Sequence, residues 1–388
     1  MNNILLLGAT GSIGDSVLSV IKHNNKELNL IGISFNKNID KARDIISNFP
    51  HLQYVHVEDP IKYESFCTKM DYDRNGSYTN SSSELEDLIN HESIDTIVCA
   101  ISGFAGLKAT YMAAHSGKKI LLANKESIVA GGDLIMPLAK KHNSEIIPID
   151  SEHNAIFQCL NGEKGTEDVK KVIITASGGP FLNSSISDLE NVTVKQALNH
   201  PNWKMGSKIT IDSATLVNKC LELIEAKYLF DLNESFFDLV VHPQSIIHSI
   251  VTYIDGSSIC QMSSPDMRVP IAHALSDANR LPIDFNPLDF TSLNLSFQAF
   301  PSDRIEIENI AREVCNKGSN LGAVFNAANE VAVASFLNDE INFDKIYEVI
   351  YRTFDANDVS NDLSIDSIND IDTHTRIEAK KVVKSLIN

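Results

Sequence analysis

A glycine-rich turn between a short apolar strand and a helix constrains the fold of this chain most strongly. Residues 3–7 are mostly apolar, residues 8–14 read GATGSIG, and apolar side chains then recur at helical spacing from Val17 to Ile21. Glycines at such a turn let a pyrophosphate approach the backbone at the N-terminus of the helix. The stretch therefore predicts a dinucleotide-binding site at the edge of a sheet.

Strand and helix signals continue to alternate along the first part of the chain. Apolar strands are expected at 28–33, 53–57, 95–100, 119–123 and 145–149, with helical patterns between them. Repeated β/α units predict a parallel sheet whose ligands bind beyond the carboxyl ends of its strands. We therefore expect an α/β protein in which residues 1–150 form a Rossmann-like, nucleotide-binding domain.

The pattern changes after residue 150. Alternating segments at 236–241, 246–253 and 257–262 predict an antiparallel layer, and residues 303–353 read as helices. We expect a central α+β catalytic domain at 151–276, a linker at 277–302 and a helical C-terminal domain at 303–388.

The end of the second expected strand bears on the choice of nucleotide. It reads SFNKN at 34–38, without the acid that usually contacts the ribose 2′-hydroxyl of NAD. A cation at this place favours a 2′-phosphate, so Lys37 predicts NADPH over NADH. A solvated loop lysine is the alternative that the spacing leaves open.

Two carboxylates follow the strand expected at 145–149. Asp150 and Glu152 are two residues apart, so they point to the same side if the chain stays extended. Hard oxygen ligands of this kind suit Mg²⁺ or Mn²⁺. A helix N-cap with an acid in its first turn is the alternative, and a third carboxylate, Glu222, favours the metal.

The densest polar stretch is 200–225, which combines an imidazole, the only tryptophan, amides, lysines and carboxylates. From Ser207 the pattern predicts one amphipathic helix on which Asn218, Lys219 and Glu222 share a face. That helix would present an anion-binding lysine and amide beside a carboxylate. An ordinary surface helix is the alternative interpretation.

Further residues near this stretch suit a phosphate. Ser213 and Thr215 lie towards the helix end where free N–H groups and the macrodipole favour anions. A Ser-Gly-Gly turn at Ser177 offers a nest of N–H groups, although a plain turn explains it equally well. Trp203 and Met205 are expected on a mobile loop before the helix.

Composition limits the partners. A net charge of −18 argues against nucleic acid and anionic membranes, although local cations can still hold a phosphorylated metabolite. Six cysteines without CxxC spacing predict reduced thiols in a cytoplasmic compartment. The apolar run at 3–7 is too short to cross a bilayer, and we expect Met1 to begin a folded domain.

Nine motifs occur together in one order and carry a resemblance to a known family. They are GATGSIG at 8–14, LANKES at 122–127, PIDSEHNAIFQ at 148–158, ASGGPF at 176–181, HPNWKMG at 200–206, DSATLVNKCLE at 212–222, HPQSIIHS at 242–249, PDMRVPIAHAL at 265–275 and NAANE at 326–330. Over essentially its whole length the chain resembles the 1-deoxy-D-xylulose 5-phosphate reductoisomerases.

The resemblance implies an NADPH-dependent oxidoreductase of non-mevalonate isoprenoid biosynthesis. Such an enzyme isomerises 1-deoxy-D-xylulose 5-phosphate and reduces the product to 2-C-methyl-D-erythritol 4-phosphate. It needs Mg²⁺, Mn²⁺ or Co²⁺, and a cytoplasmic homodimer is implied.

The resemblance also assigns the site residues. It implies metal ligands at Asp150, Glu152 and Glu222; catalytic groups at Lys125, Glu152 and His200; substrate contacts at Ser151, Ser177, His200, Trp203, Ser213, Asn218, Lys219 and Glu222; and NADPH contacts at Thr10, Gly11, Ser12, Ile13, Lys37, Asn38, Ala100, Asn124, Glu126 and Gly206. Trp203 and Met205 would belong to a flap that closes over the substrate. Asn36 stands where the family commonly has glycine, which bears on cofactor selectivity at Lys37.

Two other classes of protein also begin with a glycine turn. A short-chain reductase or epimerase would carry a YxxxK pair, and no tyrosine here has a lysine four residues on. A non-enzymatic NADPH sensor would have no use for three carboxylates. The reductoisomerase is therefore the favoured interpretation, with the proton-transfer group and the retro-aldol or α-ketol route left open.

Overall fold

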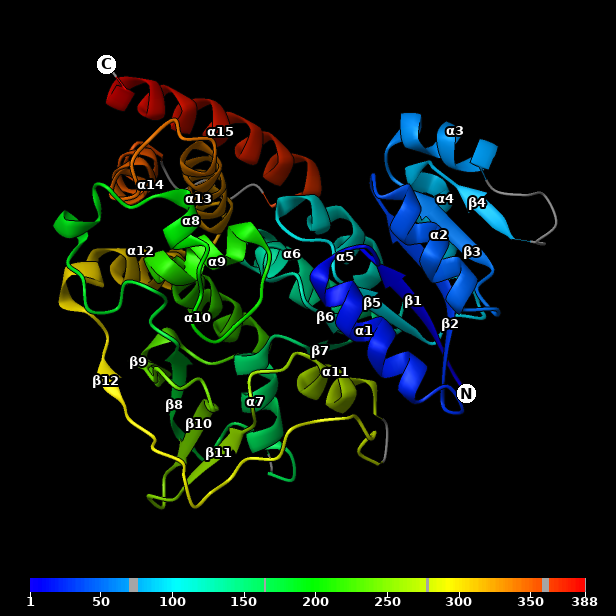
Figure 1. Cartoon of the computed structure of the whole chain (residues 1–388), viewed down its shortest axis with the longest axis horizontal. Helices are drawn as coiled ribbons and strands as arrows, with labels where there is room; N and C mark the ends of the chain where they lie inside the picture. Colours follow the sequence, from blue (N-terminus) through cyan, green and yellow to red (C-terminus); the bar gives the residue numbers. More distant parts are fainter. Residues whose placement is uncertain (70–75, 164, 277–278, 358–362, 388) are drawn as a thin grey trace. The chain divides into compact units, whose positions relative to one another are not determined.

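The computed structural model describes residues 1–69, 76–163, 165–276, 279–357 and 363–387 (Figure 1). The chain forms two compact units: residues 1–124, 135–150 and 267–285 make the first, and residues 125–134, 151–266 and 286–388 make the second. Residues 267–285 thus belong to the first unit, whereas the sequence pattern divides them between the catalytic domain and the linker. The functional boundaries of the domains stay a prediction.

A parallel sheet of seven strands forms the centre of the first unit. Its order is β4-β3-β2-β1-β5-β6-β7, and every neighbouring pair of these strands runs parallel. The chain moves outward from β1 to one edge and then from β5 to the other, so the topological switch point lies between β1 and β5. The strands are β1 (Asn2–Leu7), β2 (Leu28–Phe35), β3 (Tyr54–Val57), β4 (Ser77–Thr79), β5 (Thr96–Cys99), β6 (Lys119–Leu122) and β7 (Glu145–Pro148).

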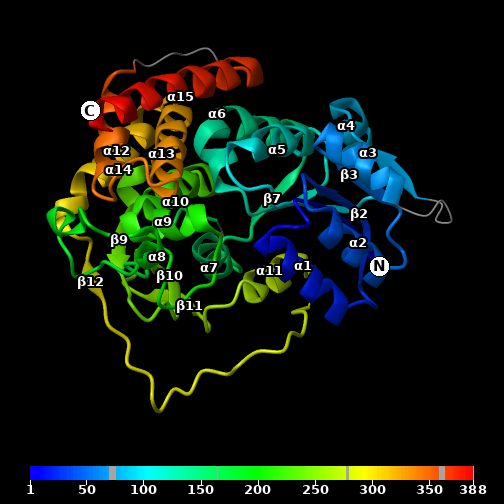
Figure 2. The ribbon, with the colours of Figure 1, turned by 45° about the horizontal axis from the view of Figure 1, so that its top comes forward.

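Helices between these strands complete the first unit. They are α1 (Ser12–His23), α2 (Ile39–Asn48), α3 (Pro60–Lys69), α4 (Ser82–Asn90), α5 (Leu107–Ala114), the later part of α6 (Lys125–His142) and α11 (Arg268–Leu275). Residues 4–7 of β1 are fully buried, as expected for a parallel strand that is covered on both faces. The returning segment lies against the unit's beginning: α11 packs on α1 (Figure 2), and Asn24 Nδ2 donates to the carbonyl of Pro282 at 3.0 Å.

A mixed sheet organises the second unit. Its order is β11-β10-β8-β9-β12, with β8 (Val169–Ala176), β9 (Phe237–Val241), β10 (Ile247–Tyr253), β11 (Ser258–Met262) and β12 (Gln298–Ala299). β10 runs antiparallel to β8 and β11, but β8 and β9 run parallel. The sequence predicts one antiparallel layer of β9, β10 and β11. The antiparallel pair of β10 and β11 is confirmed, but β8 lies between β10 and β9, and its parallel pairing with β9 was not predicted. Helices fill the connection between β8 and β9, and such a crossover permits parallel pairing.

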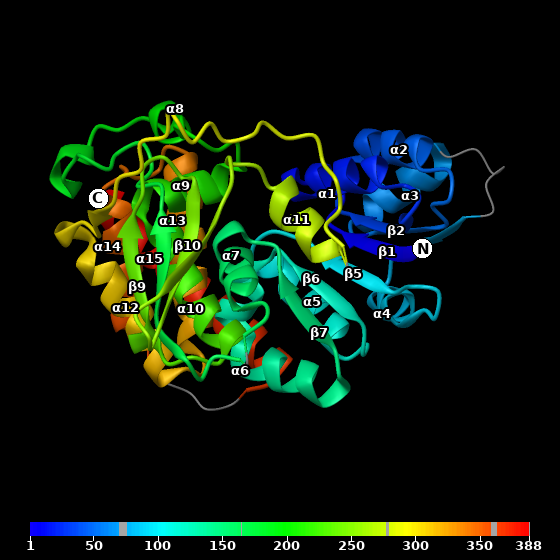
Figure 3. The same ribbon diagram turned by 90° about the horizontal axis from the view of Figure 1, so that it is seen from below.

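One face of this sheet is covered by helices. On β8, Val172 and Ile174 are buried, whereas Lys171 and Ile173 on the opposite face are partly exposed. Helix α7 (Ser151–Leu160) packs on β10 and β11 (Figure 3), and α10 (Val217–Phe230) contacts β8 and β9. The strand periodicity therefore separates a core face from a half-exposed face.

The chain ends in packed helices: α12 (Ile305–Lys317), α13 (Leu321–Leu337), α14 (Lys345–Asp355) and α15 (Ile365–Ile387). Helix α13 is buried around almost its whole circumference, because it contacts both α14 and α15 (Figure 2). The α/β class, the Rossmann-like sheet and the helical C-terminal region are thus confirmed. Among the helices described here, none combines the length and apolar character needed to cross a bilayer.

The single helix expected from Ser207 is wrong, because the stretch forms two helices. α9 (Ser207–Thr215) ends one residue before Leu216, and α10 begins one residue after it. Leu216 has φ 64° and ψ 4°, a left-handed conformation that is costly for a leucine. Its side chain is 3% exposed, so core packing holds the strained backbone in place.

Candidate active site

The glycine turn lies at the switch point of the first sheet. Gly8 has φ 86°, and a Cβ there would lie 2.5 Å from the carbonyl oxygen of Ala100. A Cβ at Gly14 would lie 2.2 Å from the carbonyl oxygen of Ala9, so α1 can approach the turn only without a side chain. The N-cap Gly11 has no side chain with which to satisfy the first N–H groups of α1, which leaves them suited to an anion.

The other predicted cofactor residues follow strands of the same sheet. Lys37 and Asn38 come after β2 and are exposed, and Asn38 accepts a hydrogen bond from the Lys41 N–H at 3.1 Å, which caps α2 (Ile39–Asn48). Asn124, after β6, is buried and donates to the carbonyls of Ile101 at 2.6 Å and Gly103 at 2.9 Å. It thereby fixes the loop that follows β5. The first unit contains Thr10, Gly11, Ser12, Ile13, Lys37, Asn38, Ala100 and Asn124, whereas Glu126 and Gly206 belong to the second.

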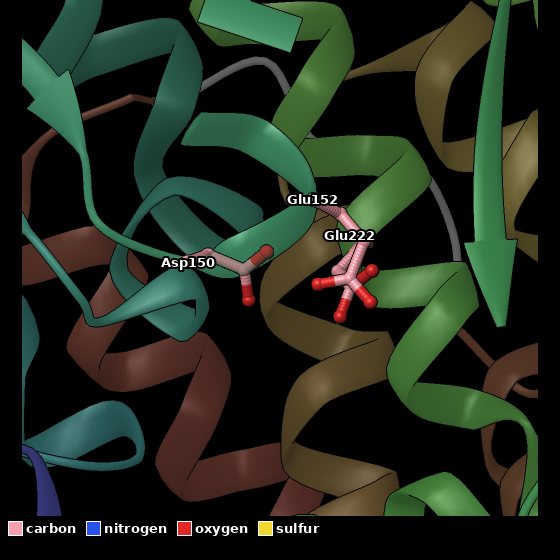
Figure 4. A group of neighbouring side chains, drawn as sticks. All are labelled: Asp150, Glu152 and Glu222. Atoms are coloured by element: carbon pink, nitrogen blue, oxygen red, sulfur yellow. The ribbon is translucent and has the colours of Figure 1, made fainter. Parts of the chain in front are cut away.

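Three carboxylates meet at the start of α7 and on α10. Asp150, Glu152 and Glu222 each offer one oxygen, and these oxygens lie within 4.8 Å of one another (Figure 4). Helix α7 begins at Ser151, so the chain is not extended between Asp150 and Glu152, and the periodicity argument for their common side is wrong. The strand-to-helix turn brings them together instead. Three hard oxygen donors at this separation suit a divalent cation.

Two buried lysines stand beside this carboxylate trio. Lys125 Nζ donates to Glu222 Oε1 at 2.8 Å and to Asn218 Oδ1 at 2.9 Å. Lys219 Nζ donates to Glu152 Oε1 at 2.8 Å and to Glu222 Oε2. Burial opposes the charge of Lys219, but Glu152 and Glu222 raise its pKa above the ordinary value. The carboxylates therefore stabilise a cation at this place, and a divalent metal ion would be stabilised in the same way.

A buried pair that we did not predict to be in the site ties α7 to α10. His153 Nε2 lies 2.9 Å from the carbonyl oxygen of Glu222, and Nδ1 lies 3.2 Å from Glu225 Oε2. Because a carbonyl only accepts, Nε2 carries a hydrogen. Both side chains are fully buried, and Glu225 lies outside the trio. Glu225 follows Glu222 by three residues, and this helical spacing is the signal in the sequence that places the two side chains near each other.

A second cluster combines two hydroxyls with an imidazole. Ser177 Oγ lies 2.9 Å from His200 Nε2 and 3.3 Å from Ser213 Oγ, and His200 Nε2 lies 3.1 Å from Ser213 Oγ. The backbone N–H groups of Asn202 and Trp203 both donate to His200 Nδ1, so the hydrogen of the neutral ring is on Nε2. Burial lowers the pKa of His200 to about 4. A neutral ring that donates beside two hydroxyls suits a phosphate oxygen.

The Ser177 turn closes against the helix that carries Ser213. Gly178 and Gly179 both have positive φ, and a Cβ at Gly179 would lie 2.8 Å from the carbonyl oxygen of Ser213. The Gly179 N–H donates to Ser177 Oγ at 3.2 Å. A glycine is therefore required here for close approach as well as for the turn.

We call residues 198–206, between α8 (Val194–Ala197) and α9, the flap loop. Asn202 Nδ2 donates to the carbonyl of Pro243 at 2.6 Å, and the Trp203 ring lies 6.0 Å from that of His248. Hydrogen bonds join predicted substrate and metal residues into two groups. The first is Lys125, Ser151, Glu152, Asn218, Lys219 and Glu222, and the second is Ser177, His200, Trp203 and Ser213.

The parallel sheet has a glycine turn at its switch point, and the carboxylate trio suits a divalent cation. Together these features are typical of metal-dependent nicotinamide nucleotide oxidoreductases. Sequence profiles of 1-deoxy-D-xylulose 5-phosphate reductoisomerase match residues 4–132, and profiles of its C-terminal domains match residues 146–230 and 262–378. The chain belongs to the 1-deoxy-D-xylulose 5-phosphate reductoisomerase family.

Full-length relatives agree with this assignment. A 1-deoxy-D-xylulose 5-phosphate reductoisomerase of Clostridium botulinum is 44% identical over 382 residues, which cover 97% of this chain and 98% of the relative. That of Pelotomaculum thermopropionicum is 42% identical over 396 residues and covers 100% of both chains.

Solved structures agree as well. A crystal structure of DOX-P reductoisomerase in complex with NADPH, fosmidomycin and magnesium has a TM-score of 0.92 and 39% identity, and covers 99% of this chain and 98% of its own. The Zymomonas mobilis enzyme in complex with NADPH has a TM-score of 0.91 and 38% identity over 99% of this chain and 100% of its own. The chain is an NADPH- and divalent-metal-dependent enzyme that converts 1-deoxy-D-xylulose 5-phosphate to 2-C-methyl-D-erythritol 4-phosphate.

Proposed function

We propose that Asp150, Glu152 and Glu222 bind the divalent metal of this reaction. The observation that carries the proposal is the convergence of their oxygens within 4.8 Å beside two lysines. The magnesium in a related crystal structure supports the same interpretation. When bound, the ion supplies Lewis-acid polarisation of the substrate carbonyl.

The substrate phosphate is held by Ser177, Ser213, Asn218 and Lys219 in this proposal. Hydroxyl and ammonium donors of this kind match the oxygens of a phosphate. Lys219 is the cation of the set, and its raised pKa keeps it charged. Anchoring the phosphate provides remote binding energy that orients the reacting end of the substrate.

Groups near the phosphate site and the trio contact the hydroxyls and the carbonyl of the sugar. Neutral His200 donates from Nε2, and Ser151 lies beside Glu152, to which its Oγ donates at 2.6 Å. Lys125 and Glu152 are the groups able to move a proton near the hydroxyls of the substrate. Trp203 on the flap loop excludes water before hydride transfer.

NADPH binds at the glycine turn of the first unit and supplies the hydride. Thr10, Ser12 and Ile13 present backbone N–H groups to the pyrophosphate, and Gly11, whose own N–H donates to the carbonyl of Gly8 at 3.1 Å, lets it approach the backbone. Lys37 approaches the 2′-phosphate. Ala100 and Asn124 belong to the neighbouring loops, and we also assign cofactor contacts to Glu126 and Gly206.

Oxidation of NADPH, followed by its absorbance, tests the proposal directly. With 1-deoxy-D-xylulose 5-phosphate and Mg²⁺ the purified chain should oxidise NADPH, and EDTA should abolish the reaction. Adding Mg²⁺, Mn²⁺ or Co²⁺ back should restore it. Turnover that survives EDTA, or oxidation without the sugar phosphate, would count against a metal-dependent reductoisomerase.

We also propose that the enzyme is a cytoplasmic homodimer. Ile173, Val240 and Ile250 lie on the half-exposed face of the second sheet, where a second copy could cover apolar surface. All six cysteines are free thiols, as expected for a reducing compartment. Light scattering should give twice the chain mass of 42.8 kDa. A mass of one chain at assay concentration would contradict the dimer.

A further inference from the structure

Lys208 occupies a position where a helix disfavours a cation. It is the second residue of α9, immediately after the flap loop, where the positive end of the helix dipole repels an ammonium group. Its Nζ nevertheless lies 2.8 Å from Glu126 Oε1 and 2.8 Å from Asp212 Oδ2. The attraction of these two carboxylates outweighs the repulsion by the helix dipole and keeps the Lys208 side chain in place.

The two partners of Lys208 come from different places. Glu126 is in the first turn of α6, next to Lys125, whereas Asp212 is on α9 itself, next to Ser213. The side chain of Asp212 is 1% exposed, so its contact with Lys208 is shielded from solvent. Burial opposes the charge of Lys208, but Asp212, Glu126 and Glu330 raise its pKa above the ordinary value.

Hydrogen bonds connect this group to the C-terminal helices. Asp212 Oδ1 accepts from Asn329 Nδ2 at 2.9 Å, and Asn329 is on α13. The next residue, Glu330, accepts from Arg376 Nη2 of α15 at 2.6 Å. Arg376 Nε also donates to Asp372 Oδ2 at 2.7 Å, so Asn329 and its neighbour Glu330 link α9 to α15 through α13.

We propose that Lys208 is a positioning residue of the reaction, which fixes the end of the flap loop and the start of α6 relative to each other. The inference rests on the proposed function, because the groups next to these joints are the ones assigned to substrate. Glu126 follows Lys125 directly, and Asp212 precedes Ser213. Helices α13 and α15 buttress the joint through Asn329 and Arg376.

The ion pairs of Lys208 should matter to substrate binding more than to the chemical step. Without these ion pairs the C-terminal end of the flap loop is no longer fixed. Closure of the loop over the sugar phosphate therefore becomes less favourable. A displacement of about 1 Å in the groups that position the substrate lowers the efficiency of the reaction by roughly tenfold to a hundredfold. We therefore expect Lys208→Gln to raise the KM for 1-deoxy-D-xylulose 5-phosphate by about tenfold and to lower kcat by less.

Trp203 provides a direct readout, because it is the only tryptophan of the chain and lies in the flap loop. In Mg²⁺ and NADP⁺, which prevents reduction, adding the sugar phosphate should change the fluorescence of wild-type Trp203. Lys208→Gln should shift that titration to about tenfold higher concentration, matching its KM. Glu126→Gln should reproduce the shift, and Lys208→Arg should restore most of the wild-type behaviour.

Lys317 is the matched control, since it forms an ion pair with Glu313 at 2.6 Å on the exposed side of α12. Lys317→Gln should leave KM and the fluorescence titration unchanged. An unchanged titration in Lys208→Gln would overturn the inference, as would losses that Lys208→Arg does not reverse. If Lys208→Gln fails to fold, the isosteric Asp212→Asn decides the question, because Asp212 is the other partner of Lys208 and is assigned to neither substrate nor cofactor. Wild type that oxidises no NADPH would instead refute the proposed function.

Discussion

Replacing Glu222 by glutamine is expected to lower metal-dependent turnover by roughly three orders of magnitude. The amide keeps the shape of the side chain but removes one of the three negative charges that converge with Asp150 and Glu152. It also weakens the partner of Lys125, whose Nζ donates to Glu222 Oε1 at 2.8 Å. The measurement is kcat at saturating sugar phosphate and NADPH over a titration of Mg²⁺.

Glu225→Gln is the matched control, because Glu225 is buried on the same helix but outside the trio. It should lower the melting temperature through its contact with His153, while the Mg²⁺ concentration for half-maximal rate stays within about twofold. Equal sensitivity to Mg²⁺ in both variants would mean that Glu222 acts through the fold and is not a ligand.

Lys219→Gln is expected to raise the KM for 1-deoxy-D-xylulose 5-phosphate by about a hundredfold. The substitution removes the cation proposed to bind phosphate, and its side chain is only 4% exposed, so solvent screens its interactions weakly. The concentration of Mg²⁺ for half-maximal rate should not rise, because a positive charge beside Glu152 and Glu222 has been removed. Steady-state kinetics with each component varied in turn separate the two effects.

Lys227 is the comparison for that variant. It lies on the same helix, 4.0 Å from Asp133 Oδ1, and is partly exposed. Lys227→Gln should leave both constants close to those of wild type. A rise in the Mg²⁺ requirement of Lys219→Gln, without a rise in KM, would contradict the assignment of Lys219 to the phosphate.

The first sheet could be predicted from the sequence because its signals are local. A strand, a glycine turn and a helix follow one another within residues 2–23, and each is recognised from its own spacing. The direction of β9 could not be predicted in this way. Its parallel pairing with β8 depends on how the helices between them pack, which strand alternation does not record.

The sequence groups the three carboxylates correctly, but the periodicity that groups Asp150 with Glu152 is not the reason why they meet. Asp150 and Glu152 were grouped by strand periodicity, yet α7 begins at Ser151 and its first turn places them. The break at Leu216 was not predictable, since neither glycine nor proline marks it. Asn218, Lys219 and Glu222 still share a face because all three follow the break on α10.

The local sequence pattern did not predict the pairings between residues that are far apart in the chain. Lys208 and Glu126 are 82 residues apart, and nothing in either local segment names the other. A lysine at the second position of a helix with an aspartate four residues on was a usable signal, because the dipole disfavours that lysine unless acids surround it. The resemblance had assigned Glu126 to the cofactor, an assignment that stays a prediction beside its contact with Lys208.

The segment 267–285, which packs on the beginning of the chain, also sets an order of events during synthesis on the ribosome. All seven strands of the first sheet have been translated by residue 148, but α11, which lies against α1, begins only at Arg268. At about ten residues per second, that interval lasts on the order of ten seconds. During that time all strands of the first sheet are present but α1 lacks its neighbour α11, and strands β8 to β11 of the second sheet are translated in between.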